Sequence, residues 1–289
     1  MIGDTPQPAI VGDVPSWRQP FDQYRVYACW FGEDSATRGQ TMPTHELHVR
    51  LHPAFDRFNE AHWYLHQIED NYHFSDPVRW NINAFLRSLK EIPQLISMAV
   101  QNDHALLEWY QLRRKELVAD PIIGQLSVAR DYLVHQGTLF PNSSAAVGIT
   151  EGRGMKFGMS FPLNCQEDSD AGMMRYIQVA KAKSGDFLRV LAPDEESTPC
   201  VRRIWRLVDV APDEEVLDLL SRAWGLVGAV LSELNERDQP DQPLQLALSC
   251  RHSVQRVQFR LYDRAELARE FRRIEPADAP RRNDRGDGA

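Results

Sequence analysis

The sequence predicts an α+β protein, with an antiparallel four-helix bundle followed by an antiparallel sheet and a covering helix. Two observations carry this prediction. Between about residues 53 and 137, apolar residues recur at three- and four-residue steps, which is the spacing of one face of a helix. Beyond Pro141, short runs rich in β-branched and aromatic residues alternate with Gly, Asp and Pro clusters, a pattern typical of strands.

Four amphipathic helices are expected in the first part of the chain. The first starts near Pro53, and its apolar face consists of Phe58, Ala61, Leu65, Ile68 and Tyr72. The second starts at Asp76-Pro77, an acidic N-cap followed by proline at the first helical position. Pro93 lies inside this second helix and predicts a kink, because proline removes a backbone donor.

The third and fourth helices have the same kind of start signal. Asp103 is expected to cap a helix over 104–120, and Asp120-Pro121 announces a helix over 121–137 that ends at Gly137. Short turns between consecutive helices favour antiparallel neighbours. The sequence therefore predicts a compact bundle of four helices.

Strands are expected in seven runs of the second part: 145–152, 155–161, 174–182, 186–192, 201–210, 244–250 and 254–262. One long helix interrupts them after Pro212, with an apolar face that runs from Val216 to Leu234, and it is expected to cover the sheet. The Gly-rich stretch GITEGRGMKFG lacks the G-K-[ST] ending of a phosphate-binding loop. It is interpreted as a hairpin turn.

The pattern divides the chain into four parts. Residues 1–44 form an N-terminal extension rich in Pro, Gly and Asp around the apolar run RVYACWFG, and residues 45–140 form the helical bundle. Residues 141–275 form an α+β C-terminal domain. The polar tail over 276–289, rich in Pro and Gly, is expected to be disordered.

Composition excludes several classes of protein. The content of 43% apolar and 26% charged residues is that of a globular protein, and no apolar run is long enough to span a membrane. The N-terminus lacks a secretory signal, so a cytoplasmic location is expected. Four widely spaced cysteines argue against a disulfide framework or zinc ribbon and are interpreted as buried small residues. The net charge of −8 implies that any contact with nucleic acid is local.

Several histidines lie along the first helix, on a stripe that consists of His62, His66, Glu69 and His73. A pair of histidines four residues apart can bind zinc, and a metal-dependent hydrolase built on His62 and His66 is one alternative. However, no other helix brings a matching set of ligands. The sequence also lacks a G-x-S-x-G elbow or a local cysteine signature for a nucleophile. No metal and no cofactor are therefore predicted.

The fourth helix contains the stretch RDYLVH, with Arg130 and His135 at the edges of the apolar face and Asp131 directly after the arginine. Asp131 and His135 are four residues apart and hence neighbours on one side of the helix. The arginine side chain presents a planar fork of donors suited to a phosphate, and histidine suits proton transfer. These are the groups needed to cleave RNA without a metal, with attack of the ribose 2′-OH on the adjacent phosphorus.

With this motif the chain resembles the HEPN superfamily, helical bundles whose last helix carries R-x4-6-H with a polar residue after the arginine. R-D-Y-L-V-H fits, although asparagine is common where this chain has Asp131. NAFLRSL in the second helix and EWYQLRRKELVADPIIGQLSVARDYLVHQG across the third and fourth also look like this group. The resemblance covers residues 76–137.

The resemblance implies a metal-independent endoribonuclease that acts as a homodimer with a composite active site. Arg130 would bind the phosphate, His135 would be the acid/base, and Asp131 would orient one of them. Arg113, Arg114 and Lys115 are expected to bind RNA locally. Many such enzymes are toxins or phage-defence effectors, which implies a neutralising or regulatory protein partner. The alternative from another class is a non-catalytic HEPN-like binding or scaffolding protein.

Overall fold

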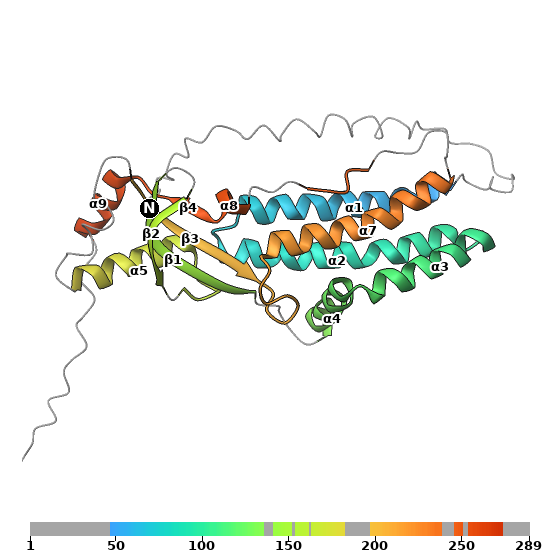
Figure 1. The fold of residues 1–289 in the computed structure, drawn as a ribbon, viewed down its shortest axis with the longest axis horizontal. Coiled ribbons are helices and arrows are strands. Elements are labelled where there is room, and N and C mark those ends of the chain that lie inside the picture. Colours follow the sequence, from blue (N-terminus) through green and yellow to red (C-terminus); the bar gives the residue numbers. More distant parts are fainter. Residues whose placement is uncertain are drawn as a thin grey trace, which may run out of the picture. The chain divides into compact units, whose positions relative to one another are not determined.

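The computed structural model describes residues 47–135, 141–151, 154–161, 163–182, 197–238, 246–250 and 254–273. Within these ranges, helices and a four-stranded antiparallel sheet confirm the α+β class (Figure 1). Three predicted features lie outside the described residues: the N-terminal extension over 1–44, the strand over 186–192 and the disordered tail over 276–289.

The four helices predicted for the first part are present. They are α1 (Leu47–Asp70), α2 (Ser75–Val100), α3 (His104–Ala119) and α4 (Pro121–His135). α1 begins before the predicted start at Pro53, because Leu47 and Leu51 continue the apolar face and are buried. The apolar positions predicted for the first helix are buried as well, and α2 buries a face that includes Val78, Ile82, Phe85 and Leu89. Their burial against one another forms the main core of the protein.

The start of α2 is stabilised from outside the helix. The predicted cap at Asp76-Pro77 was wrong: the helix begins at Ser75, and Phe74 before it makes no side-chain cap hydrogen bond. Instead, the Asp168 carboxylate accepts hydrogen bonds from the Ser75 backbone N–H at 2.7 Å and from its hydroxyl at 3.0 Å. A distant loop thus supplies the acceptor that a helix N-terminus needs.

The predicted caps of α3 and α4 are confirmed. The Asp103 carboxylate accepts a hydrogen bond from the Leu106 N–H at 3.0 Å. Asp120 accepts from the N–H groups of Ile122 and Ile123 at 2.9 and 3.3 Å. These bonds satisfy backbone donors that have no partner within the helix.

Replacing Asp103 by alanine is expected to lower the free energy of unfolding by about 1 kcal/mol, the usual value of an N-cap side chain. Asp103→Asn keeps an acceptor and should retain most of the stability. Urea unfolding of both variants, beside Asp56→Ala at an exposed position of α1, checks the cap. Equal losses in Asp103→Ala and Asp56→Ala would contradict it.

Helix α7 (Val216–Asp238) is the long helix predicted after Pro212, but the expectation that it covers the sheet was wrong. It packs beside α1 and α2 (Figure 1). The Trp224 ring stacks on Phe58 with centroids 4.4 Å apart, and its Nε1 donates to the Phe58 carbonyl at 3.0 Å. Apolar periodicity predicts that one face of a helix is buried. It does not predict whether that face packs on a sheet or on other helices.

The sheet has the strand order β2-β1-β3-β4, with neighbouring strands antiparallel. The strands are β1 (Asn142–Glu151), β2 (Gly154–Phe161), β3 (Thr198–Arg206) and β4 (Phe259–Leu261). Glu151 pairs with Gly154, so the hairpin predicted in the Gly-rich stretch is confirmed. Strand β3 confirms most of the run predicted over 201–210.

The helix that covers the sheet is α5 (Ser169–Ala182), where the sequence predicted a strand over 174–182. Met173, Tyr176 and Ile177 are buried against the sheet at helical spacing. β-Branched and aromatic residues caused the wrong prediction, because burial on a sheet favours them in helices as well as in strands.

The C-terminal part is less regular than predicted. Residues 246–250, expected to end a strand, form neither helix nor strand. The run over 254–262 contains the short helix α8 (Val254–Val257) and then β4, and α9 (Arg264–Arg273) follows. In the part of the chain that the structure describes, no helix combines the length and apolar content needed to cross a membrane.

Candidate functional site

Helix α4 carries the predicted catalytic residues and is held by the rest of the bundle. Its cap at Asp120 fixes the start of the helix, and Ile123 and Leu126 are buried against the other helices. α4 contacts both α2 and α3 (Figure 1). The predicted site residues of α4 therefore lie on a helix that packs against α2.

Arg130 and Asp131 meet a cation of α2. The Arg130 Nη1 donates to the Asp131 Oδ1 at 3.2 Å, and the Lys90 ammonium forms an ion pair with the same oxygen. The side chains keep 23%, 49% and 28% of their surface exposed for Arg130, Asp131 and Lys90. The cluster is therefore reachable from solvent.

Electrostatics keep the shared carboxylate ionised. The pKa of Asp131 is lowered, first by the hydrogen bond with Lys90 and then by that with Arg130. Because two cations share one carboxylate, this cluster has an excess of positive charge. Lys90 was missed in the sequence, since it lies on a different helix and belongs to no local motif with Arg130.

His135 is the last residue of α4, one helical turn beyond Asp131. Its side chain lies outside the described residues, so its contact with Asp131 stays a prediction. The partner that the structure gives to Asp131 on α4 is Arg130. Of the two orienting roles predicted for Asp131, the one towards the arginine therefore has a described contact.

The basic run on α3 divides into two kinds of residue. Arg113 donates from Nε to Glu233 of α7 at 2.9 Å and pairs with Glu116 as well. Arg114 and Lys115 are exposed. Arg113 therefore links α3 to α7, and the two residues that follow it present their charge to solvent.

A cleft of about 650 Å³ runs beside α4. It is lined by the end of α3, by Gly124, Gln125, Val128 and Ala129 of α4, and by residues 207–210 after β3. The cleft lies along the same helix as Arg130 and Asp131, but Lys90, Arg130 and Asp131 are not among the residues that line it.

The histidine stripe of the first helix does not act as a unit. His73 lies beyond the end of α1 and contacts α5 and α8: its Nδ1 lies 2.8 Å from the Ser169 hydroxyl, and its Nε2 lies 2.9 Å from the Val257 carbonyl. Burial lowers the pKa of His73 to about 4. This histidine is a neutral structural residue.

His62 and His66 instead lie beside Cys250. The pKa of His66 is raised to about 9, first by its hydrogen bond with Cys250 and then by that with Glu69. Cys200 is buried as predicted, whereas Cys165 and Cys250 are only half-buried. The interpretation of the cysteines as buried apolar residues was therefore wrong for Cys250, which contacts polar groups.

Residues 43–184 match a protein family described as bacteriophage lambda protein ea47. The match covers just under half of the chain, and Arg130 and Asp131 lie within it. α7 and Cys250 lie outside. Comparisons with curated proteins and with solved structures gave no match. The similarity thus covers α1 to α4, the first hairpin and α5, and the family description names no activity.

Proposed function

We propose that the protein is a metal-independent endoribonuclease with its active site on α4. The observation that carries this proposal is the cluster of Lys90, Asp131 and Arg130, which places two cations at the surface one turn before His135. RNA cleavage needs positive charge at the phosphate and a group that transfers a proton. The cluster supplies the charge, and histidine has an ordinary pKa near neutrality.

Each residue has a role in this mechanism. Arg130 and Lys90 bind the phosphate, and Asp131 holds both side chains in place. The ribose 2′-oxygen attacks the adjacent phosphorus and gives its proton to a base, while His135 protonates the 5′-oxygen as its bond to phosphorus breaks. The products are a 2′,3′-cyclic phosphate and a 5′-hydroxyl. The cleft beside Ala129 offers room for a neighbouring nucleotide.

A dimer would complete this site. We propose that two copies bring their α4 helices together, so that the histidine of one copy acts as the base and that of the other as the acid. Light scattering should then show a dimer, and activity per chain should fall on dilution. A neutralising or regulatory protein partner is part of the same proposal.

A second candidate is a non-catalytic binding or scaffolding protein. One observation favours it: Arg130, Asp131 and Lys90 already contact one another within the chain, as in a cluster that supports the fold. All three side chains remain partly exposed, which favours a ligand-binding role instead. The two candidates differ in the products of incubation with RNA.

The expected result is cleavage of a mixed RNA pool by the wild type in excess EDTA, with cyclic phosphate ends. Arg130→Ala and His135→Ala should each lower the rate by about a hundredfold or more, since each removes a group used in the transition state. Lys90→Ala should weaken cleavage because it removes one of the two cations. End-group analysis of the products checks the mechanism.

Arg222→Ala is the matched control, because this exposed arginine of α7 pairs with Glu214 away from the cluster. It should cleave like the wild type. If the folded wild type leaves RNA intact but binds it, and Arg130→Ala binds more weakly, the site belongs to a binding protein. Equal cleavage by all variants would place any activity elsewhere.

A further inference from the structure

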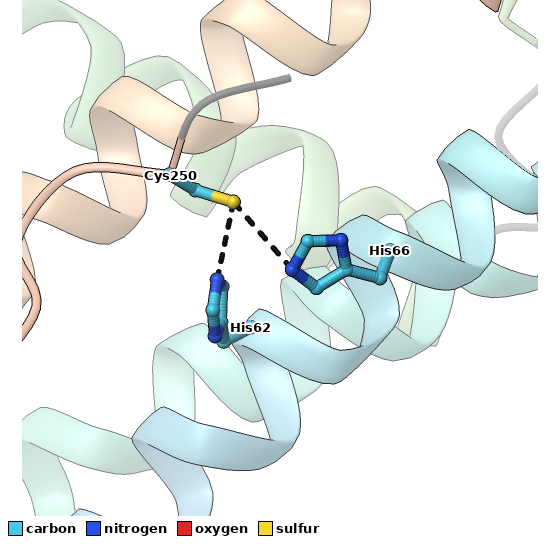
Figure 2. A group of neighbouring side chains, drawn as sticks. All are labelled: His62, His66 and Cys250. Atoms are coloured by element: carbon cyan, nitrogen blue, oxygen red, sulfur yellow. Dashed lines mark hydrogen bonds between the residues drawn. The ribbon is translucent and has the colours of Figure 1, made fainter. Parts of the chain in front are cut away.

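Two histidines of α1 and a cysteine far along the chain converge on one point (Figure 2). The His62 Nε2 lies 3.1 Å from the Cys250 Sγ, and the His66 Nε2 lies 3.6 Å from the same sulfur. One ligand atom from each residue lies within 4.8 Å of the others. The histidines are one helical turn apart, and both rings face the sulfur.

These distances suit a bound metal ion. Zinc lies about 2.3 Å from a thiolate sulfur and about 2.0–2.1 Å from an imidazole nitrogen, usually in tetrahedral geometry. Those bond lengths separate sulfur from nitrogen by about 3.6 Å. The distance between His66 and Cys250 already has this value, and His62 requires an adjustment of only about half an ångström.

Both imidazoles are oriented by a second contact. The His66 Nδ1, the ring nitrogen away from the cysteine, lies 3.3 Å from the Glu69 carboxylate. Histidines that bind metals commonly have a carboxylate at this position. The His62 ring stacks on Trp224 with centroids 4.5 Å apart and an angle of 14° between planes. The rings of His62 and His66 are thus held in a fixed orientation before any ion binds.

The third residue is positioned by a close approach of the chain to α7. A Cβ atom at Gly225 would lie 2.7 Å from the Leu248 carbonyl oxygen, and one at Gly228 would lie 2.9 Å from the Leu248 side chain. The glycines therefore let residues 246–250 lie directly on α7. This contact places Cys250 opposite the two histidines.

We propose that His62, His66 and Cys250 bind a zinc ion, with the fourth position open to water or another ligand. Three protein ligands and an open position are the arrangement of catalytic zinc sites. A cysteine nucleophile would need one histidine as its base. Here two imidazoles lie near the sulfur, His62 at 3.1 Å and His66 at 3.6 Å. A nucleophile has no use for the second imidazole, whereas a metal ion would use both as ligands.

The test uses the full chain loaded with zinc or with cobalt(II) after removal of weakly bound metal. We expect one tightly bound zinc per chain by elemental analysis, and a thiolate-to-metal charge-transfer band with cobalt. Cys250→Ser, His62→Ala and His66→Ala should each weaken binding by about a hundredfold or more, and Cys250→Ser should abolish the band. Glu69→Gln should weaken binding by about 10–100-fold.

Cys165→Ser is the matched control, because Cys165 is half-buried like Cys250 and lies outside the cluster. It should bind zinc like the wild type. Gly225→Ala keeps every ligand and improves helix propensity, yet it should weaken binding by about tenfold or more by pushing residues 246–250 away from α7. Circular dichroism confirms that each variant is folded.

Two results would overturn the proposal. One is Cys250→Ser binding zinc as tightly as the wild type. The other is a folded wild type that retains no zinc, and fast alkylation of Cys250 by iodoacetamide in that protein would assign a Cys–His nucleophile. Because the cluster consists of two residues of α1 and Cys250 and includes no residue of α4, Cys250→Ser should leave RNA cleavage unchanged. EDTA should remove zinc from the wild type without changing its RNA cleavage. The Cys250→Ser variant should cleave RNA equally with and without EDTA.

Discussion

Arg203→Ala is expected to lower the free energy of unfolding by about 3–5 kcal/mol, because it removes two hydrogen bonds from a charged donor, each worth about 1.5–3 kcal/mol. Arg203 is fully buried although it lies in the middle of β3. Its Nη1 donates to the Glu167 carbonyl at 2.6 Å, and its Nη2 donates to the Asn164 carbonyl at 3.2 Å. Truncation leaves both carbonyls without this donor and opens a void.

Arg203 is a buried charge that also holds the loop between the sheet and the helices. Burial lowers the pKa of Arg203 to about 10, so the side chain is still charged at neutral pH. Its guanidinium lies 3.8 Å from the Trp205 ring centroid. The loop that it holds also contains Asp168, the acceptor at the start of α2. Loss of Arg203 should therefore loosen the junction between sheet and helices.

Urea unfolding checks this prediction, with Arg202→Ala as the matched control. Arg202 is the preceding residue of β3, is exposed and bonds to Gln258 from the other face. Its removal should cost no more than about 1 kcal/mol. Similar losses in the two variants would show that the buried hydrogen bonds of Arg203 add little.

Glu215→Gln is expected to change how stability depends on pH. Glu215 is buried, and its carboxylate accepts hydrogen bonds from the Tyr72 hydroxyl at 2.7 Å and from the Leu217 N–H at 2.7 Å, at the start of α7. Burial raises its pKa to about 7, against about 4.3–4.5 in an unfolded chain. The folded protein therefore holds a proton on Glu215 over a pH range in which the unfolded chain has lost it.

The sign follows from proton linkage. Between about pH 4.5 and 7 the folded state binds more protons at Glu215, so this group's contribution to stability falls as pH rises. The full difference is about 3 kcal/mol, from a shift of roughly 2.5 pH units. His73 opposes it, because its pKa of about 4 makes stability rise with pH between about 4 and 6.5.

The measurement compares wild type and Glu215→Gln by urea unfolding at about pH 4.5 and pH 8. Glutamine cannot ionise, so the difference in unfolding free energy between the two proteins isolates Glu215. The wild type should gain about 3 kcal/mol relative to the variant at the lower pH. With the His73 contribution then unopposed, the variant should lose stability on acidification. Parallel pH profiles would contradict the raised pKa.

The helices of the first part could be predicted because their signals are local. The apolar spacing of α1 and α2 and the carboxylate caps of α3 and α4 depend on residues within a few positions. α5 was missed because its β-branched and aromatic residues pack on a sheet. The true acceptor at the start of α2, Asp168, is distant in sequence, so no local pattern could identify it.

The candidate sites show the same division. Arg130 and Asp131 were selected by a short motif on one helix, whereas Lys90 joins them from another helix. His62 and His66 were recognised as a pair that can bind zinc. Their third partner, Cys250, lies in a segment without regular structure, and the sequence interpretation discarded it.

By itself, the sequence determined the α+β class, the helices α1 to α4, the first hairpin and the choice of α4 as a candidate site. These features follow from periodicity, caps and turns, which are interactions between residues close along the chain. Only the tertiary structure decided that α7 joins the helices, that α5 covers the sheet, and that Lys90 and Cys250 reach their sites. Such contacts depend on which apolar faces bury one another, and sequence spacing carries no record of that choice.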